Sequence, residues 1–437
     1  MTELHRSSSK SFQPKFGVLT IICILVILSI LTLFSSESTS LKLYHDIFAK
    51  NETAVKSPSL HLQRSKYGYH RPRPPYVPIQ HTSHTCVINR NTSSERLIHL
   101  PTAVPHLILI GAQKSATSEF QVLANKHINV ITPLSAEKFE PHYLEGRVEP
   151  GLMRYVSAGN DIAEFDDALC QFREKYTKFF NMSQVNSNKM SVVMEKTPAY
   201  MLHHNLPFFI DALCPWKPKI LTILRDPVDR AWSHFRMKKI GRNKTITTPF
   251  ETIVKGEINS FILNGLLDNA TTSLDDFEAS LANTSDMPSS PFVFPNLTLE
   301  EYSLIIQHYR TNKRGFLIRG LYAPILLPWV KKFAEDDRLM VMKFEEVWNA
   351  SIVDEVLSFA GVKDKRIDEH YDDFIRNRYG KIMRKANKNA TGDRHANKGK
   401  HQMPLDPTIR VYLKFFYQPF NRLLVELLGE EWEGWGE

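Results

Sequence analysis

Two short stretches of the chain carry lysine, arginine and hydroxyl side chains directly after apolar, strand-forming segments. The first, GAQKSATS, follows His106–Ile110 and offers Lys114 and the hydroxyl groups of a helix that begins near Thr117. The second, LRDPVDRAWSHF, offers Arg225 and Ser233. Ammonium and guanidinium groups bind phosphate-like anions, as do the free N–H groups at the start of a helix. We therefore predict a site for a ligand that carries anionic groups at both ends.

The first stretch does not fit the phosphate loop of nucleotide kinases. That loop needs a second glycine, followed directly by lysine and a Mg²⁺-binding hydroxyl. Here Gly111 is the only glycine, and Ala116 stands where flexibility would be wanted. Taken alone, the stretch fits an ordinary strand-to-helix turn with a surface lysine equally well. The second stretch favours the anion site, because ligands of open α/β sheets bind at the carboxyl ends of strands.

Parallel strands joined by helices are the elements that would place these residues. Apolar segments read as buried strands at 106–110, 191–194, 220–224 and 338–344. Segments with helical spacing of apolar residues lie between them. The pattern predicts one α/β domain of P-loop-like type, in which a parallel β-sheet is flanked by helices.

The pair of stretches resembles the sulfotransferase family, and further segments extend the resemblance. These are KFEPHYL (Lys138–Leu144), EKTPAYM (Glu195–Met201), NKGKHQMPLDP (Asn397–Pro407) and the closing FFYQPFNRLLVELLG. The resemblance covers roughly residues 104–435. It is strongest to the Golgi glycosaminoglycan sulfotransferases, among them the N-acetylgalactosamine 4-sulfate 6-O enzyme and the heparan sulfate N- and 3-O enzymes.

The resemblance implies 3′-phosphoadenosine 5′-phosphosulfate as the sulfuryl donor and no metal. The residues implied in donor binding are Lys114, Ser115, Ala116, Thr117 and Ser118 at the 5′-phosphosulfate, Arg225 and Ser233 at the 3′-phosphate, and Lys398, Gly399 and Lys400 in a closing loop. The family often has arginine at the position of Lys400, so a point charge replaces a bidentate fork there. Lysines and backbone dipoles would supply the charge stabilisation that Mg²⁺ supplies in kinases.

A carboxylate beside the first loop would complete the chemistry, because transfer to a sugar hydroxyl requires removal of the hydroxyl proton. The resemblance implies Glu140 as this base. Glu137 remains a rival, since it lies one helical turn away. His142 would orient the base or the sugar. Lys114 would stabilise charge on the leaving nucleotide, and Lys196 would assist at the sulfonate.

The expected acceptor is a glycosaminoglycan-type polysaccharide, with 6-O-sulfation of chondroitin or dermatan sulfate as the first expectation. Heparan sulfate 3-O- or N-sulfation is the alternative within the family. A formal net charge of +8 and the basic segment 376–401 favour an acidic partner, and we expect no nucleic acid. Rival classes are a nucleotide kinase, a tyrosylprotein sulfotransferase and a non-catalytic lumenal polyanion-binding protein. The sequence leaves the acceptor position and the oligomeric state open.

The N-terminal part predicts a membrane anchor. We expect a cytoplasmic tail at 1–16, a transmembrane signal anchor at 17–34, a proline-rich stem at 35–100 and the lumenal domain at 101–437. The uncharged run is long enough to span a bilayer, and the positive residues before it place the N-terminus in the cytosol. The expected location is the Golgi membrane, with a single-pass type II topology. A signal peptide cleaved in the serine-rich segment after it is the alternative.

Sequons and cysteines fit a lumenal domain. Asn-x-Ser/Thr triplets begin at Asn51, Asn91, Asn181, Asn243, Asn269, Asn283, Asn296, Asn349 and Asn389. Beyond the anchor the cysteines are Cys86, Cys170 and Cys214. We expect a Cys170–Cys214 disulfide, with two plain buried thiols as the alternative. His81, His84 and Cys86 lack a second ligand pair at zinc spacing, so no metal site is expected.

Overall fold

The structure is a computed structural model. It describes residues 65–72, 76, 82–88, 96–100, 102–134, 139–157, 162–188, 190–240, 247–283, 289–309, 315–362, 377, 380 and 404–436. Several expected features lie outside these residues: the 17–34 anchor, Glu137, the loop residues Lys398, Gly399 and Lys400, and the sequons at Asn51, Asn91, Asn243 and Asn389. Within the described residues, no helix is long and apolar enough to cross a membrane.

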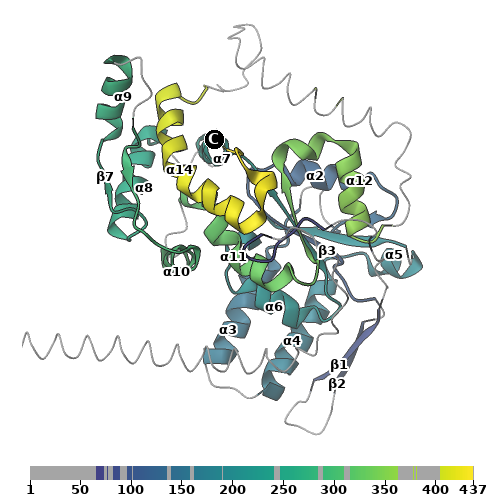
Figure 1. Cartoon of the computed structure of the whole chain (residues 1–437). Helices are drawn as coiled ribbons and strands as arrows, with labels where there is room; N and C mark the ends of the chain where they lie inside the picture. The colour runs from purple at the N-terminus through teal and green to yellow at the C-terminus, as the bar shows by residue number, and fades with distance from the viewer. Residues whose placement is uncertain are drawn as a thin grey trace, which may run out of the picture.

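A five-stranded sheet with the order β4-β5-β3-β6-β9 lies at the centre of the domain (Figure 1). The strands are β4 (Val130–Ile131), β5 (Val192–Lys196), β3 (Leu107–Gly111), β6 (Lys219–Leu224) and β9 (Leu339–Lys343). All neighbouring strands run parallel. The strands are almost entirely buried and read as continuous runs of Val, Ile, Leu and Met, as expected for a sheet covered on both faces.

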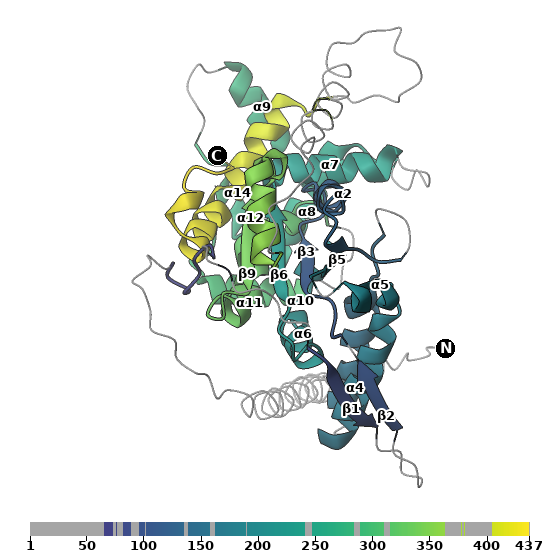
Figure 2. The same cartoon turned by 90° about the vertical axis from the view of Figure 1, so that its right-hand side faces the viewer.

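Helices cover both faces of the sheet (Figures 1 and 2). One face packs on α2 (Thr117–Ala124) and α12 (Ala350–Phe359). The other face belongs to a larger core that includes α4 (Ile162–Thr177), α6 (Leu206–Leu213), α7 (Pro227–Ile240), α11 (Tyr322–Phe333) and α14 (Pro407–Leu428). The predicted α/β architecture, a parallel sheet flanked by helices, is confirmed.

The remaining elements surround these layers. They are η1 (Leu144–Val148), α3 (Glu149–Ser157), α5 (Met182–Ser187), η2 (Tyr200–Leu202), α8 (Phe250–Leu263), β7 (Asn269–Ala270), α9 (Leu274–Asn283), β8 (Phe292–Val293), α10 (Leu299–Tyr309), η3 (Ile318–Gly320), η4 (Phe344–Trp348) and η5 (Glu430–Trp432). Helix α8 packs on α14 through stacked rings of Phe261 and Phe416, whose centroids are 5.3 Å apart. The sequon residues Asn181 and Asn349 are exposed and cap helices α5 and α12 with their side chains.

Parts of the expected stem pack against the domain, whereas the sequence predicted an extended spacer. Strands β1 (His84–Ile88) and β2 (Arg96–Leu100) form an antiparallel hairpin. Earlier in the chain, Tyr69 is fully buried, and its hydroxyl accepts a hydrogen bond from the backbone N–H of Val341 at 3.0 Å. Folded structure therefore begins well before residue 100.

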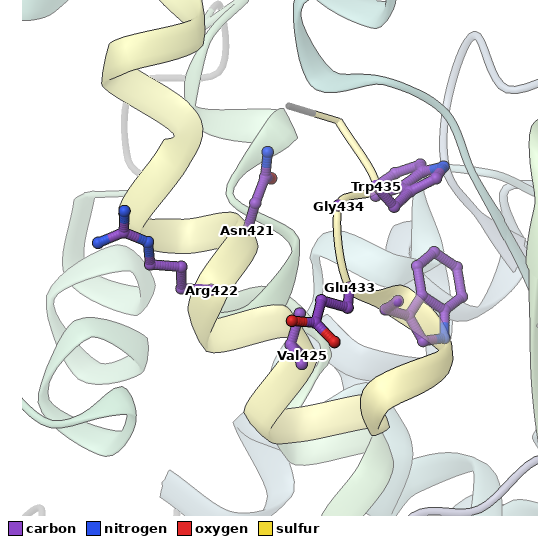
Figure 3. Close-up of a pocket in the computed structure, with 7 residues that line it drawn as sticks. Asn421, Arg422, Val425, Glu433, Gly434 and Trp435 are labelled. Atoms are coloured by element: carbon purple, nitrogen blue, oxygen red, sulfur yellow. The ribbon is translucent and has the colours of Figure 1, made fainter.

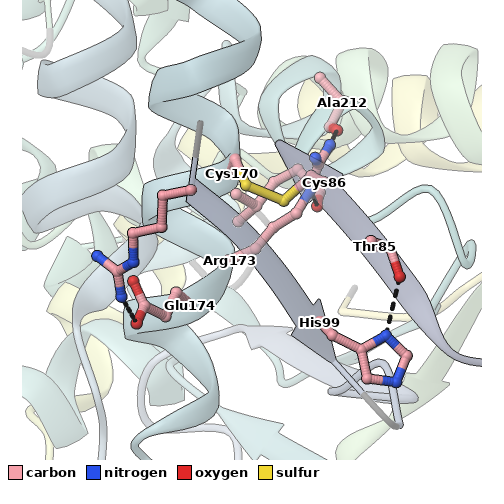
Figure 4. Close-up of a disulfide and its surroundings, with 9 residues drawn as sticks. Thr85, Cys86, His99, Cys170, Arg173, Glu174 and Ala212 are labelled. Atoms are coloured by element: carbon pink, nitrogen blue, oxygen red, sulfur yellow. Dashed lines mark hydrogen bonds and ion pairs between the residues drawn. A yellow bond between two sulfur atoms is a disulfide. The ribbon is translucent and has the colours of Figure 1, made fainter. Parts of the chain in front are cut away.

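The expected Cys170–Cys214 disulfide is wrong. Cys170 of α4 instead joins Cys86 of the hairpin, with their Cα atoms 5.9 Å apart (Figure 4). Cys214 is a buried free thiol. The contact between α4 and the end of α6 is made by Arg173, which donates hydrogen bonds to the carbonyl groups of Ala212 and Leu213 at 2.8 and 2.7 Å. The sequence pattern missed the true pair because it assigned Cys86 to a solvated stem.

We predict that replacing Cys86 and Cys170 together with alanine lowers the free energy of unfolding by about 2–5 kcal/mol, because the unfolded chain is then no longer cross-linked. Denaturant unfolding of the wild type and the double variant measures the change. Peptide mapping without reductant should recover a Cys86–Cys170 linked peptide, and Cys214 should react with an alkylating agent only after unfolding. A linked peptide that contains Cys214 would contradict this arrangement.

Candidate active site

The two anion-binding stretches meet at the carboxyl ends of neighbouring strands. Strand β3 leads into the loop with Lys114, and strand β6 ends directly before Arg225. The Arg225 Nη1 atom lies 3.5 Å from the Lys114 carbonyl oxygen. Helix α2 begins after Ala116 with no side-chain cap, so its first N–H groups point toward the loop without a capping side chain. The geometry is therefore that of a strand–loop–helix anion site.

The loop lies close against the EKTPAYM segment. A Cβ atom on Gly111 would lie 2.7 Å from the Cβ of Met201, so only glycine fits at the start of the loop. Lys114 and Ala116 adopt positive φ angles of 79° and 60°, which turn the backbone sharply before the helix. Close packing and a tight turn thus fix the path of this loop.

Lys196 connects three of the predicted segments. It is the last residue of β5, and its side chain is fully buried. Its ammonium group donates hydrogen bonds to the Ser118 hydroxyl at 3.1 Å and to Glu140 Oε1 at 2.8 Å. The structure thereby brings the expected base, the second catalytic lysine and the first turn of α2 into direct contact.

His142 lies between two carboxylates. Its Nε2 atom is 3.3 Å from Glu140 Oε2, and its Nδ1 atom is 2.5 Å from Glu145 Oε1. Glu145 was absent from the set of residues predicted from the sequence. Its spacing of one helical turn from His142 is the signal that could have indicated it. The expected orienting contact of His142 on Glu140 is present in the structure, with Glu145 on its far side.

Several positively charged side chains gather on the Lys114 side of the site. Burial lowers the pKa of Lys114, and the charges of Arg225, Arg236 and Arg230 lower it further. Arg230 is fully buried and donates one hydrogen bond to the Phe316 carbonyl. Its Nε and Nη1 atoms have no hydrogen-bond partner among the described residues. The charge of Arg230 interacts with the buried Glu257 carboxylate, but its unmade hydrogen bonds are unfavourable, so this region suits a bound anion.

Arg225 is held by contacts on three sides. The Tyr322 hydroxyl donates to its carbonyl oxygen at 2.7 Å, and its guanidinium lies 4.7 Å from the centre of the Phe344 ring. Asp229 lies 3.8 Å from it and forms a shorter ion pair of 2.6 Å with Arg410. These contacts hold Arg225 in position. Its charge is only partly neutralised, because Asp229 pairs more closely with Arg410.

A buried carboxylate ties the Glu140 segment to strand β5. Glu195 accepts hydrogen bonds from Thr197 at 2.8 Å and from the Tyr176 hydroxyl. The Tyr200 hydroxyl, which also interacts with Glu195, accepts a hydrogen bond from the Leu144 N–H at 3.2 Å. Burial raises the pKa of Glu195 to about 7, against an ordinary value of 4.5. This cluster fixes the backbone close to the residues expected in catalysis.

The other predicted positions fall at the edges of this site. Ser115 and Thr117 are buried in the loop and the start of α2, and Ser233 lies partly exposed on α7. A separate cavity of about 260 Å³ lies between α14 and the C-terminal turn, lined by Asn421, Arg422, Val425, Trp432, Glu433, Gly434 and Trp435 (Figure 3). None of the predicted site residues lines it. The described part of the chain holds no group of three or more His, Cys, Asp or Glu side chains suited to a metal ion.

We predict that Glu195→Gln changes how stability depends on pH. The pKa of Glu195 is raised in the folded state, so its stabilising contribution is present below about pH 4.5 and is lost as the pH rises through about 7. Wild-type protein should lose on the order of 3 kcal/mol more than the variant across this range. Unfolding measured from pH 5 to 8 tests this. The exposed Glu278→Gln variant is the control, and parallel curves for Glu195→Gln and the wild type would contradict the prediction.

Comparison with known proteins gives a family for this fold and site. Residues 104–404 match the family described as the sulfotransferase domain. Among solved structures, the chain is similar to a sulfotransferase from Alicyclobacillus acidocaldarius, with 17% sequence identity, a TM-score of 0.41, and coverage of 75% of this chain and 96% of that one. It is also similar to the sulfotransferase domain from the curacin biosynthetic pathway, with 14% identity, a TM-score of 0.20, and coverage of 64% and 99%. No curated protein matches the sequence. Because the family match spans more than half of the chain, the protein belongs to the sulfotransferase domain family, whose reaction is the transfer of a sulfuryl group.

Proposed function

We propose that the protein transfers a sulfuryl group from 3′-phosphoadenosine 5′-phosphosulfate to a hydroxyl of a glycosaminoglycan-type polysaccharide. The observation that carries the proposal is the contact of Lys196 with both Glu140 and Ser118, on the same side of the sheet as buried arginine N–H groups that have no hydrogen-bond partner among the described residues. A base, a cation and an anion-binding helix start are then adjacent, as transfer between an anionic donor and a hydroxyl requires.

The residues present fit this donor. A nucleotide with a phosphosulfate at one end and a phosphate at the other needs cations at two neighbouring strand ends. Lys114 follows β3, and Arg225 follows β6, the adjacent strand. The orphaned N–H groups of buried Arg230 add positive charge to the same region. When bound, the donor supplies the sulfuryl group and a nucleotide bisphosphate leaving group.

The protein's own residues would act on the acceptor and on the developing charge. Glu140 accepts the proton of the attacking hydroxyl. His142, in contact with Glu140 Oε2, orients this carboxylate. Lys114 and the free N–H groups of α2 stabilise negative charge on the departing oxygen. Lys196, hydrogen-bonded to Ser118 at the start of the same helix, assists at the sulfonate.

The acceptor follows from the family resemblance and from charge. The formal net charge of +8 favours an acidic chain such as chondroitin or dermatan sulfate, for which we propose 6-O-sulfation. Heparan sulfate, sulfated at the 3-O or N position, is the alternative acceptor. We further propose that the domain lies in the Golgi lumen behind an N-terminal signal anchor. A protein that only binds polyanions is the alternative of another class.

Lys114→Ala and Arg225→Ala should each weaken binding of 3′,5′-adenosine bisphosphate by about 10- to 100-fold, because each removes a charge-assisted contact to a phosphate group. Isothermal titration calorimetry measures the dissociation constants. Lys255→Ala, which removes a partly exposed cation on α8 that pairs with Glu251 and Asp275, is the control. Wild-type protein that does not bind the bisphosphate would overturn the proposed donor.

Glu140→Gln should retain bisphosphate binding and lower kcat by about 10²- to 10⁴-fold, since the amide cannot accept the hydroxyl proton. A transfer assay with labelled donor, EDTA present, and chondroitin, dermatan, heparan and acidic peptide acceptors measures kcat and identifies the acceptor.

Unchanged turnover in this variant would assign the base role to Glu137 or His142. Loss of turnover in EDTA would favour kinase-type chemistry. Transfer to peptides alone would indicate a tyrosylprotein sulfotransferase. Polyanion binding with no transfer would leave the non-catalytic alternative.

A further inference from the structure

Arg236 lies on the same side of helix α7 as Ser233. At 100° per residue, the two side chains are about 60° apart around the helix axis and one turn apart along it. Around the helix axis, the side chain of Asp229, which contacts Arg225, points between those of Ser233 and Arg236. Helix α7 starts at Pro227, two residues after Arg225, which directly follows β6. Arg236 therefore belongs to the half of the site that β6 and α7 build.

The guanidinium of Arg236 is partly buried, and the part of the chain that the structure describes offers it no ion-pair partner. Its Nε atom is buried and has no hydrogen-bond acceptor among the described residues. No carboxylate in the described part of the chain forms an ion pair with it. Burial lowers its pKa, and the charge of Arg225 lowers it further. Two arginines whose charges repel one another are expected where a ligand with two negative charges binds.

We propose that Arg236 is a third ligand of the donor's 3′-phosphate, beside Arg225 and Ser233. This inference rests on the proposed donor and extends its recognition beyond the two residues that the sequence motif indicates. A guanidinium suits the role because its planar fork binds two phosphate oxygens at once.

The strand order separates this position from the acceptor. The base Glu140 and its partner Lys196 lie at the end of β5, and the phosphosulfate loop follows β3. Strand β6 lies on the other side of β3 from β5. Because Arg236 is on the helix that follows β6, it lies on the side of the phosphosulfate loop opposite the base. Arg225 and Ser233, which hold the 3′-phosphate in the proposed donor site, lie on this same side.

The test compares nucleotides with and without the 3′-phosphate. Titration calorimetry on the full chain, purified from a secretory host, measures binding of 3′,5′-adenosine bisphosphate and of adenosine 5′-phosphosulfate. Arg236→Ala should weaken binding of the bisphosphate by about 10- to 100-fold and leave binding of adenosine 5′-phosphosulfate within about twofold. Arg236→Lys should recover part of the loss, because the charge returns without the fork.

Lys238→Ala is the matched control, since it removes one positive charge from the same helix at an exposed position that points about 160° away. Equal weakening of both nucleotides by Arg236→Ala would overturn the proposal, as would an unchanged bisphosphate affinity with a raised KM for the acceptor. A thermal melt of each variant separates these outcomes from loss of fold, and Arg236→Lys serves where the alanine variant does not fold. Wild-type protein that binds neither nucleotide would defeat the proposed donor itself.

Discussion

The buried ion pair between Lys196 and Glu140 is the interaction on which the rest of the site depends. A lysine without solvent contact needs a partner, because an unpaired ammonium group in the interior is strongly unfavourable. Glu140 supplies the negative charge, and Ser118 supplies a further acceptor at the first turn of α2. The pair therefore holds the end of β5, the Glu140 segment and the anion-binding loop in one arrangement. Its carboxylate is also partly exposed, so the same group that neutralises the lysine can meet a hydroxyl from solution.

The Glu140 segment is short and irregular, and aromatic side chains next to it in the sequence pack on helix α4 and the turn after it. Tyr143 stacks on Tyr176 with ring centroids 5.3 Å apart, and Phe139 packs near Phe179. Both partner rings belong to α4 or the turn that follows it. Helix α4 is in turn joined to the hairpin by Cys86–Cys170 and to the end of α6 by Arg173. Positioning of the proposed base thus relies on aromatic packing, a buried carboxylate cluster and a covalent cross-link, none of which touches the reacting groups.

Local patterns predicted the sheet and both anion-binding stretches because each depends on residues close together in the sequence. Apolar runs such as Ile220–Leu224 identify buried strands directly, and the motif order indicated the sulfotransferase family. Long-range pairing was not accessible in the same way. The Cys86–Cys170 disulfide crosses 84 positions, and the sequence gives no distance between a hairpin and a helix. Glu145, Arg230 and Arg236 were also missed, because their importance appears only when helix faces are seen against the loop. The membrane anchor and the roles assigned to site residues stay predictions.

The hairpin that precedes the domain changes what a cut in the chain would do. A protease that cuts between Cys86 and Cys170 would leave two polypeptides, which the disulfide keeps covalently linked until a reductant breaks it. A cut before Ser65 would instead leave this hairpin and the Tyr69 hydroxyl, which bonds to Val341 of β9, in the same polypeptide as the central sheet. A shortened chain that keeps this contact must therefore begin before Tyr69, far ahead of the first strand of the central sheet.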